Sequence, residues 1–305
     1  MRAYMWLGWR FWLLPSGLAA LLLWSDWPAI RSMADRWMND PRYSHGILVP
    51  VFALYLLWRR RDLCPGPAGY PDYRGVALIF GGVASQLTGA LVYLGWLEGF
   101  ALTLSLGGVV MLWGGAKALR WALPSLGFLV FMIPLPYRFE VALGGPLQRF
   151  GTLASTYILQ TAGLPAIAEG NIIRLDDQAS IAVVEACNGL GMLAAFACYS
   201  TAVAMMMENR SLVTRSIILL SAVPLALVAN ITRITATGLV HSTLGGGAAD
   251  LVFHDLAGWL MMPLAIGLLW GELTLLGALI IEQEWGNPAA ALALKQALSA
   301  NAVRR

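Results

Sequence analysis

Long apolar stretches, separated by short polar ones, constrain the fold of this chain more than any other feature of its sequence. Of its 305 residues, 58% are hydrophobic and only 12% are charged, well outside the range of soluble globular proteins. A membrane-spanning helix needs about 20 apolar residues, so the spans take up most of the chain. We predict an all-α, polytopic integral membrane helix bundle of about eight spans, at residues 11–27, 46–58, 75–96, 99–116, 121–137, 188–207, 212–240 and 256–282.

Basic residues indicate how these spans are oriented, because cytoplasmic loops of membrane proteins are enriched in Lys and Arg. The opposite orientation would place most of the Lys and Arg outside the cell. The net charge of +3 therefore reflects topology, and no basic stripe indicates nucleic-acid binding. With both termini in the cytoplasm, 13 of the 20 basic residues fall inside: Arg2, Arg10, Arg59, Arg60, Arg61, Arg74, Lys117, Arg120, Arg210, Arg215, Lys295, Arg304 and Arg305.

The spans form one predicted domain. We place a single transmembrane domain at residues 1–285 and a cytoplasmic tail at residues 286–305. The apolar run 11–24 follows Arg2 and Arg10 as in a signal peptide, but no small-residue cleavage site comes after it. We therefore expect it to be an uncleaved first helix.

The largest predicted outside segment covers residues 138–186. Within it, apolar and charged residues at 139–163 predict an amphipathic helix that lies on the membrane interface. The following stretch predicts a β-hairpin that turns at Asp176-Asp177 and leads the chain to Cys187. The other outside segments are expected to be loops, at residues 28–45 and 241–254.

Of the three cysteines, Cys187 is the one predicted to lie at the outer boundary of the membrane. It precedes the sixth span, where the N–H groups and positive dipole end of a helix favour a thiolate. Cys64 falls in a cytoplasmic loop, and Cys198 is too far along the same helix to form a disulfide with Cys187. The alternative for Cys187 is a structural role as a small buried hydrophobic residue.

A polar stripe marks the outer part of the seventh span. Asn230 and Arg233 are three residues apart and share one helix face, which Thr237 extends. An arginine within a span costs at least about 2.5–3.5 kcal/mol on insertion scales, so this face should point into the bundle. The alternative is an arginine that snorkels to the interface or pairs helices.

His254 opens the eighth span, again at the predicted outer boundary. A single interfacial histidine is more often structural than catalytic, and His241 and His45 are the only others in the chain. Cys187, Arg233 and His254 together are stronger evidence for a catalytic site than any one of them alone. A thiol, a guanidinium and an imidazole at one face of a membrane favour cysteine-nucleophile acyl transfer.

Several ordered motifs resemble those of the exosortase/archaeosortase family of membrane cysteine transpeptidases. The resemblance implies a catalytic Cys187, an Arg233 that stabilises the transition state and a general acid/base His254. Asn188 and Gly191 depart from the pattern, since many relatives have Ser and a basic residue there. The motifs are Asp40-Pro-Arg-Tyr-Ser-His-Gly-Ile-Leu-Val-Pro50, Ile133-Pro-Leu-Pro136, Val184-Glu-Ala-Cys-Asn-Gly-Leu190, Pro224-Leu-Ala-Leu-Val-Ala-Asn-Ile-Thr-Arg233, and His254 before Gly258-Trp259.

The resemblance also implies partners and a location. Substrates would be secreted proteins with a C-terminal sorting signal: a short motif such as Pro-Glu-Pro, a hydrophobic span and a basic tail. The enzyme would lie among the lipids of the bacterial inner membrane, with its site facing the exterior. A lipid or glycan amine, or water, would accept the acyl group. No cofactor is implied.

Further polar residues are candidates for supporting roles. Glu185 could pair with Arg233 or with the substrate's basic tail, and Asn188 adjoins the cysteine. Substrate-groove candidates are Asp40, Tyr43 and His45, although Asp40 before a proline equally suits a turn.

Other classes of site and of protein fit the sequence less well or only in part. No metal-ligand spacing is present, which argues against a metalloprotease. A transporter lined by Asn230, Arg233 and His254 is one alternative, although no inverted repeats are evident. The other is a non-catalytic assembly protein for envelope polysaccharide.

Overall fold

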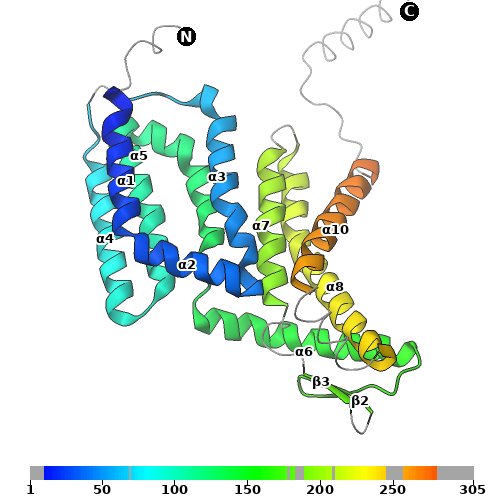
Figure 1. The fold of residues 1–305 in the computed structure, drawn as a ribbon. Coiled ribbons are helices and arrows are strands. Elements are labelled where there is room, and N and C mark those ends of the chain that lie inside the picture. The colour runs from blue at the N-terminus through cyan, green and yellow to red at the C-terminus, as the bar shows by residue number, and fades with distance from the viewer. Residues whose placement is uncertain are drawn as a thin grey trace, which may run out of the picture. The chain divides into compact units, whose positions relative to one another are not determined.

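The structure is a computed structural model that describes residues 10–68, 70–176, 179–182, 189–207, 210–244 and 257–279. It is mainly helical (Figure 1) and comprises two compact units, residues 1–265 and 266–305. The predicted division at residue 285 stays a prediction. The α-helices are α1 (Arg10–Ser25), α2 (Trp27–Asn39), α3 (Leu48–Arg59), α4 (Arg74–Val92), α5 (Gly95–Phe128), α6 (Tyr137–Thr161), α7 (Leu190–Met206), α8 (Leu212–Leu244) and α10 (Ala257–Leu279).

Three of these helical segments are long and apolar enough to cross a membrane: Arg74–Val92, Gly95–Met132 and Leu212–Leu244. Shorter apolar helices lie at Pro15–Ser25, Leu190–Met206 and Pro263–Leu275. The predicted all-α membrane class therefore fits, whereas the number of eight spans and their orientation stay predictions. The predicted fourth span and the first part of the predicted fifth form one segment, α5, whose backbone departs from helical geometry at Gly115 (φ +68°, ψ −167°).

Glycines allow α4 and α5 to pack closely. Gly75 and Gly82 are buried on α4, seven residues apart and hence on one helix face. A Cβ atom built on Gly108 of α5 would lie 2.7 Å from the Gly75 carbonyl oxygen, closer than real side chains come. Small residues at such contacts are the usual means by which membrane helices approach one another.

The prediction of a loop at residues 28–45 is wrong, because most of this segment is helical. Helix α2 begins with Pro28 in its first turn, where a missing N–H costs nothing, and buries Ala29 and Met33. The 3₁₀ helix η1 (Pro41–Ile47) follows. Figure 1 shows α2 and α6 lying crosswise to α1, α3 and α5, at the same end of these helices.

The predicted outside segment folds as a helix followed by a sheet. Helix α6 confirms the predicted amphipathic helix, and the hairpin is confirmed by β2 (Ile172–Asp176) and β3 (Ala179–Ala182), which pair antiparallel. An unpredicted strand, β1 (Ile167–Glu169), pairs antiparallel with β2 and gives the order β1-β2-β3. The sheet packs on α6 and α8 through a core of Leu159, Ala166, Ile173, Leu175 and Ile234.

Candidate active site

Four of the predicted site residues lie outside the part of the chain that the structure describes: Glu185, Cys187, Asn188 and His254. The structure does describe the chain that resumes just after the cysteine, at Gly189, and the whole polar stripe of α8. The site is therefore built here from α8, from the first turn of α7 and from the elements that touch them.

Asn230 holds Arg233 on α8. The Nη2 of Arg233 donates a hydrogen bond of 2.9 Å to the Oδ1 of Asn230, as their spacing on one helix face predicted. Asn230 is only 1% exposed, and Arg233 is half-buried. Thr237 is also buried, and its hydroxyl donates to the Arg233 carbonyl oxygen at 3.0 Å. A buried amide oxygen thus fixes one end of the guanidinium, which limits the rotamers that Arg233 can adopt.

Two glycines enclose the Asn230 side chain. A Cβ atom on Gly189 would lie 3.0 Å from Asn230 Nδ2, and one on Gly151 of α6 would lie 3.1 Å from the same atom. Gly189 precedes α7 in the left-handed region (φ +82°), which a residue with a Cβ adopts only with strain. Asn230 therefore connects α6, α8 and the residue two positions after Cys187.

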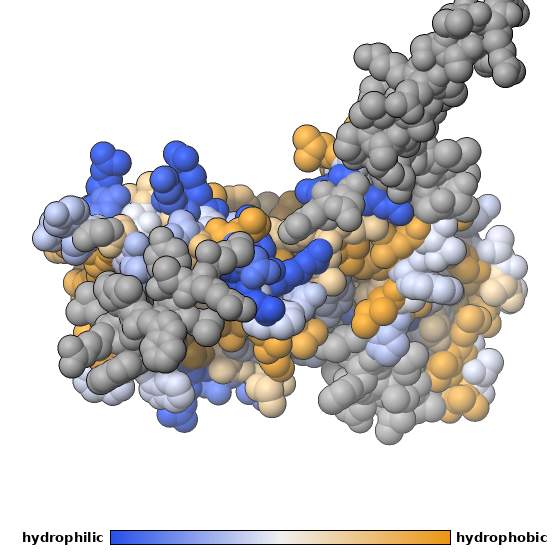
Figure 2. Space-filling view, turned by 90° about the horizontal axis from the view of Figure 1, so that it is seen from above, coloured by the Kyte–Doolittle hydropathy of each residue, from blue (hydrophilic) through white to orange (hydrophobic). Residues whose placement is uncertain are grey.

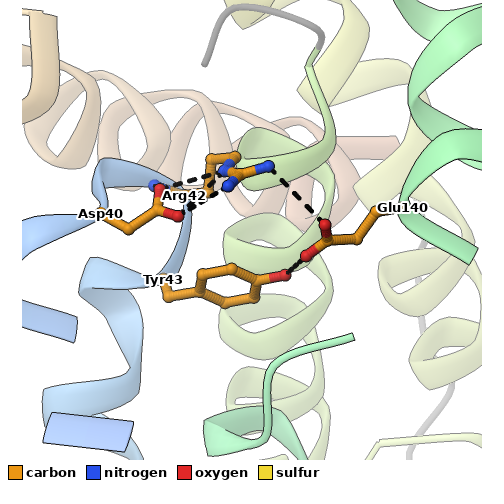
Figure 3. Close-up of polar contacts among 4 residues, drawn as sticks. All are labelled: Asp40, Arg42, Tyr43 and Glu140. Atoms are coloured by element: carbon orange, nitrogen blue, oxygen red, sulfur yellow. Dashed lines mark hydrogen bonds and ion pairs between the residues drawn. The ribbon is translucent and has the colours of Figure 1, made fainter. Parts of the chain in front are cut away.

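A charged cluster fixes η1 against the start of α6 (Figure 3). Asp40 accepts hydrogen bonds from the backbone N–H of Arg42 at 3.0 Å and from its guanidinium at 2.8–3.1 Å. Arg42 Nη1 lies 3.8 Å from a carboxylate oxygen of Glu140, and the Tyr43 hydroxyl donates to the other oxygen. Burial, and next the bond to the Glu140 carboxylate, raise the pKa of Tyr43 above its ordinary value.

The charged cluster also touches the start of α7. A Cβ atom on Gly191 would lie 2.7 Å from the Arg42 Cα, so the first turn of α7 lies directly against η1. Asn230 thus lies against Gly189, and Arg42 lies against Gly191, two residues further along the chain. Both contacts lie within four residues of Cys187 along the chain.

His45, the third groove candidate, lies in η1 and is only 2% exposed. Burial lowers the pKa of His45 to about 4, against a smaller effect of a hydrogen bond to the Phe131 backbone. Its Nδ1 has no hydrogen-bond partner among the described residues. It is therefore a neutral, buried imidazole near pH 7.

One comparison with known proteins decides the family. The model of the transmembrane exosortase family (Exosortase_EpsH) matches residues 37–271, which is most of the chain. The chain belongs to the transmembrane exosortase family. The match covers the motifs that carried the sequence resemblance, from Asp40 to His254, and it supports a membrane transpeptidase-type role in general terms. No curated protein and no solved structure matches the chain significantly.

Within this exosortase, sequence reasoning missed two residues of the charged cluster. The motif that begins at Asp40 gives Arg42 no role of its own, and Glu140 is one of several charged positions in the amphipathic segment 139–163. Arg42 and Glu140 are almost a hundred residues apart, and no pattern in a single sequence indicates a contact over such a separation. Among the described residues, no group of three His, Cys, Asp or Glu side chains could hold a metal ion.

Proposed function

We propose that this exosortase is a membrane-embedded cysteine transpeptidase that removes the C-terminal sorting signal of secreted proteins at the outer face of the inner membrane. The observation that supports this most directly is the contact between Gly189 and Asn230. It connects the chain just after the proposed nucleophile Cys187 to the side chain that holds Arg233. A nucleophile and a cationic donor that share one supporting residue are suited to acyl transfer.

The first half of the proposed reaction transfers the acyl group to the enzyme. The Cys187 thiolate attacks the carbonyl carbon of the scissile peptide bond, and the carbonyl oxygen becomes an oxyanion. Arg233 donates hydrogen bonds to this oxyanion as its charge develops. Collapse of the tetrahedral intermediate breaks the C–N bond, His254 protonates the departing amine, and a thioester to Cys187 remains.

The second half passes the acyl group to an acceptor. The amine of a lipid or glycan loses a proton to His254 and attacks the thioester carbonyl. The C–S bond breaks and the Cys187 thiolate leaves, so that the enzyme returns to its starting state. With water in place of the amine, the same steps give hydrolysis.

The hydrogen bond from Arg233 to Asn230 supports the role of an oxyanion donor. Catalytic donors are effective when they are already oriented before charge develops, because no free energy is then spent on reorganisation. Asn230 orients one guanidinium nitrogen at 2.9 Å, and a guanidinium carries five N–H donors in a planar fork. Removing such a donor lowers kcat by roughly 10²–10³-fold in other acyl-transfer enzymes.

The apolar surface of α6 supports substrate binding at the membrane interface. Apart from Leu159, its buried residues are small or polar, whereas other large apolar side chains are exposed: Phe139, Val141, Leu143, Phe150, Leu153, Tyr157 and Ile158. An exposed apolar face on an interfacial helix can contact lipid or the hydrophobic span of a sorting signal. With both termini cytoplasmic, α6 would lie at the outer side, where the signal's motif would be cleaved.

The test uses co-expression of the exosortase with a tagged Pro-Glu-Pro sorting-signal substrate and follows loss of the C-terminal helix by gel mobility. Cys187→Ala should leave the substrate intact, and Cys64→Ala is the matched control because Cys64 lies in the loop before α4. Arg233→Lys keeps the positive charge but loses the planar fork, so it should lower the processing rate by at least about tenfold. Equal processing by wild type and Cys187→Ala would eliminate Cys187 as the nucleophile.

A further inference from the structure

An apolar cavity of about 640 Å³ lies between α1, α2, α3 and α5. Arg233 lies on a different helix, α8. Its walls run along Leu102 to Trp113 on one arm of α5 and along Pro50 to Leu57 on α3. Apart from two serines, the lining consists of apolar and aromatic residues. An empty apolar space of this size costs the surrounding side chains their packing contacts, so it favours the binding of an apolar molecule.

The dimensions of the cavity suit an extended hydrocarbon chain. Leu102 and Trp113 are eleven residues apart, which corresponds to about 16 Å of helix. A volume of about 640 Å³ over this length gives a mean cross-section of at least about 40 Å². An extended hydrocarbon chain in contact with neighbours at about 4.5 Å needs only about 20 Å².

The cavity is open to the surroundings of the helices. Leu23 of α1 and Leu54 of α3 both line it, yet their side chains are 44% and 66% exposed. On the surface of a membrane protein, such exposed leucines contact lipid. A hydrocarbon chain can therefore enter sideways from the bilayer between these two helices.

One end of the cavity adjoins a run of arginines. Trp121 lines the cavity, and its indole N–H donates to the carbonyl oxygen of Arg60 at 2.7 Å. The Nε of Arg60 is buried without a hydrogen-bond partner among the described residues. The neighbours of Arg60 are engaged, since Arg59 donates to the Met206 carbonyl oxygen at 3.0 Å and Arg61 lies 4.6 Å from the Trp58 ring. Figure 2 views the molecule from above and shows several groups of hydrophilic side chains among hydrophobic ones on this face.

We propose that the cavity binds the acyl chain of an anionic phospholipid, whose phosphate lies at Arg60. The phosphate would supply the acceptor that the Arg60 Nε lacks, and charge-assisted bonds of this kind are strong. The positive-inside distribution puts Arg60 on the cytoplasmic side, so the lipid belongs to the cytoplasmic leaflet, whose anionic headgroups attract basic residues. This site is separate from the proposed peptide chemistry, because its lining residues come from the first half of the chain, whereas Arg233 lies on α8.

The test measures lipid retained by the full-length protein. The protein is reconstituted with equal amounts of phosphatidylglycerol and phosphatidylcholine, extracted with detergent and analysed by native mass spectrometry. Wild type should retain phospholipid and prefer phosphatidylglycerol. Ala53→Trp fills the cavity from α3 and should abolish retention, whereas Val51→Trp, on the same helix but outside the cavity and 63% exposed, should not.

A second pair of variants tests the headgroup and does not depend on whether Ala53→Trp folds. Arg60→Gln should lower the ratio of phosphatidylglycerol to phosphatidylcholine by about fivefold, the effect of one basic residue at a membrane surface. Arg61→Gln removes an equal charge that already lies against Trp58 and should change the ratio less. Absence of retained lipid, equal retention of both lipids by wild type, or equal effects of the two arginine variants would each overturn the proposal.

Discussion

Replacing Gly189 with alanine tests whether the chain after Cys187 must approach Asn230. Gly189 has a φ of +82°, and a Cβ there would lie 3.0 Å from Asn230 Nδ2. Gly163, at the end of α6, has a φ of +88°, but a Cβ there would meet no atom within 4 Å. The two substitutions therefore share the backbone strain and differ in the contact, which makes Gly163→Ala the matched control.

The expected losses of stability and activity follow from the backbone strain and from the contact with Asn230. The left-handed conformation costs a residue with a Cβ about 1–2 kcal/mol, so both variants should lose about that much stability. Gly189→Ala must in addition displace Asn230 or the start of α7. If this breaks the hydrogen bond between Asn230 and Arg233, the loss of a charge-assisted bond is about 1.5–3 kcal/mol. Where that bond supports the transition state, this energy corresponds to a fall of about 10–150-fold in kcat/KM.

The assay combines thermal unfolding in detergent with the initial rate of sorting-signal processing in membranes. Both variants should lower the Tm, while only Gly189→Ala should reduce the processing rate beyond the fraction of protein lost. Gly189→Ala with the same specific activity as Gly163→Ala would refute the reasoning. The contact with Asn230 would then be a packing feature without influence on Arg233.

Three further outcomes are expected, all measured by thermal unfolding. Gly82→Ala should destabilise the protein by about 1–3 kcal/mol, since its Cβ would lie 2.9 Å from a backbone oxygen of α5, whereas Gly81→Ala should be tolerated. Because burial lowers the pKa of His45 to about 4, folding stability should fall as the pH decreases from about 6.5 towards 4, and His45→Gln should lose this component. Tyr43→Phe should cost about 1.5–3 kcal/mol by leaving the Glu140 carboxylate without its hydroxyl donor, and no loss would show that the bond is dispensable.

The parts of the fold that a single sequence predicts are those with a local signal. The continuous apolar run of α8 and the alternation of β2 and β3 depend on neighbouring residues, and the structure has both elements. The shared face of Asn230 and Arg233 likewise follows from helical geometry alone, and the hydrogen bond between them confirms it.

The missed features depend on contacts between distant segments or on weaker local patterns. The apolar residues of α2 form a stripe, Ala29, Met33 and Trp37, which charged residues interrupt. Glu140 gains its role only because α6 starts beside η1, which no local pattern indicates. The break in α5 falls at Gly115, since glycine readily adopts a positive φ, instead of at the basic residues that were expected to separate two spans.

Two separate elements pack against the start of α7, which explains why glycines occur there. Gly189 lies against Asn230 of α8, and Gly191 lies against the backbone of Arg42, which the ion pairs with Asp40 and Glu140 hold in place. A side chain at either glycine would push this turn away from one of its supports. The position of the turn relative to Arg233 is therefore set by packing against two separate elements. Acyl transfer requires the attacking atom and the oxyanion donor to be held close to their reactive separation, and we propose that this packing serves that requirement for Cys187, two residues before Gly189.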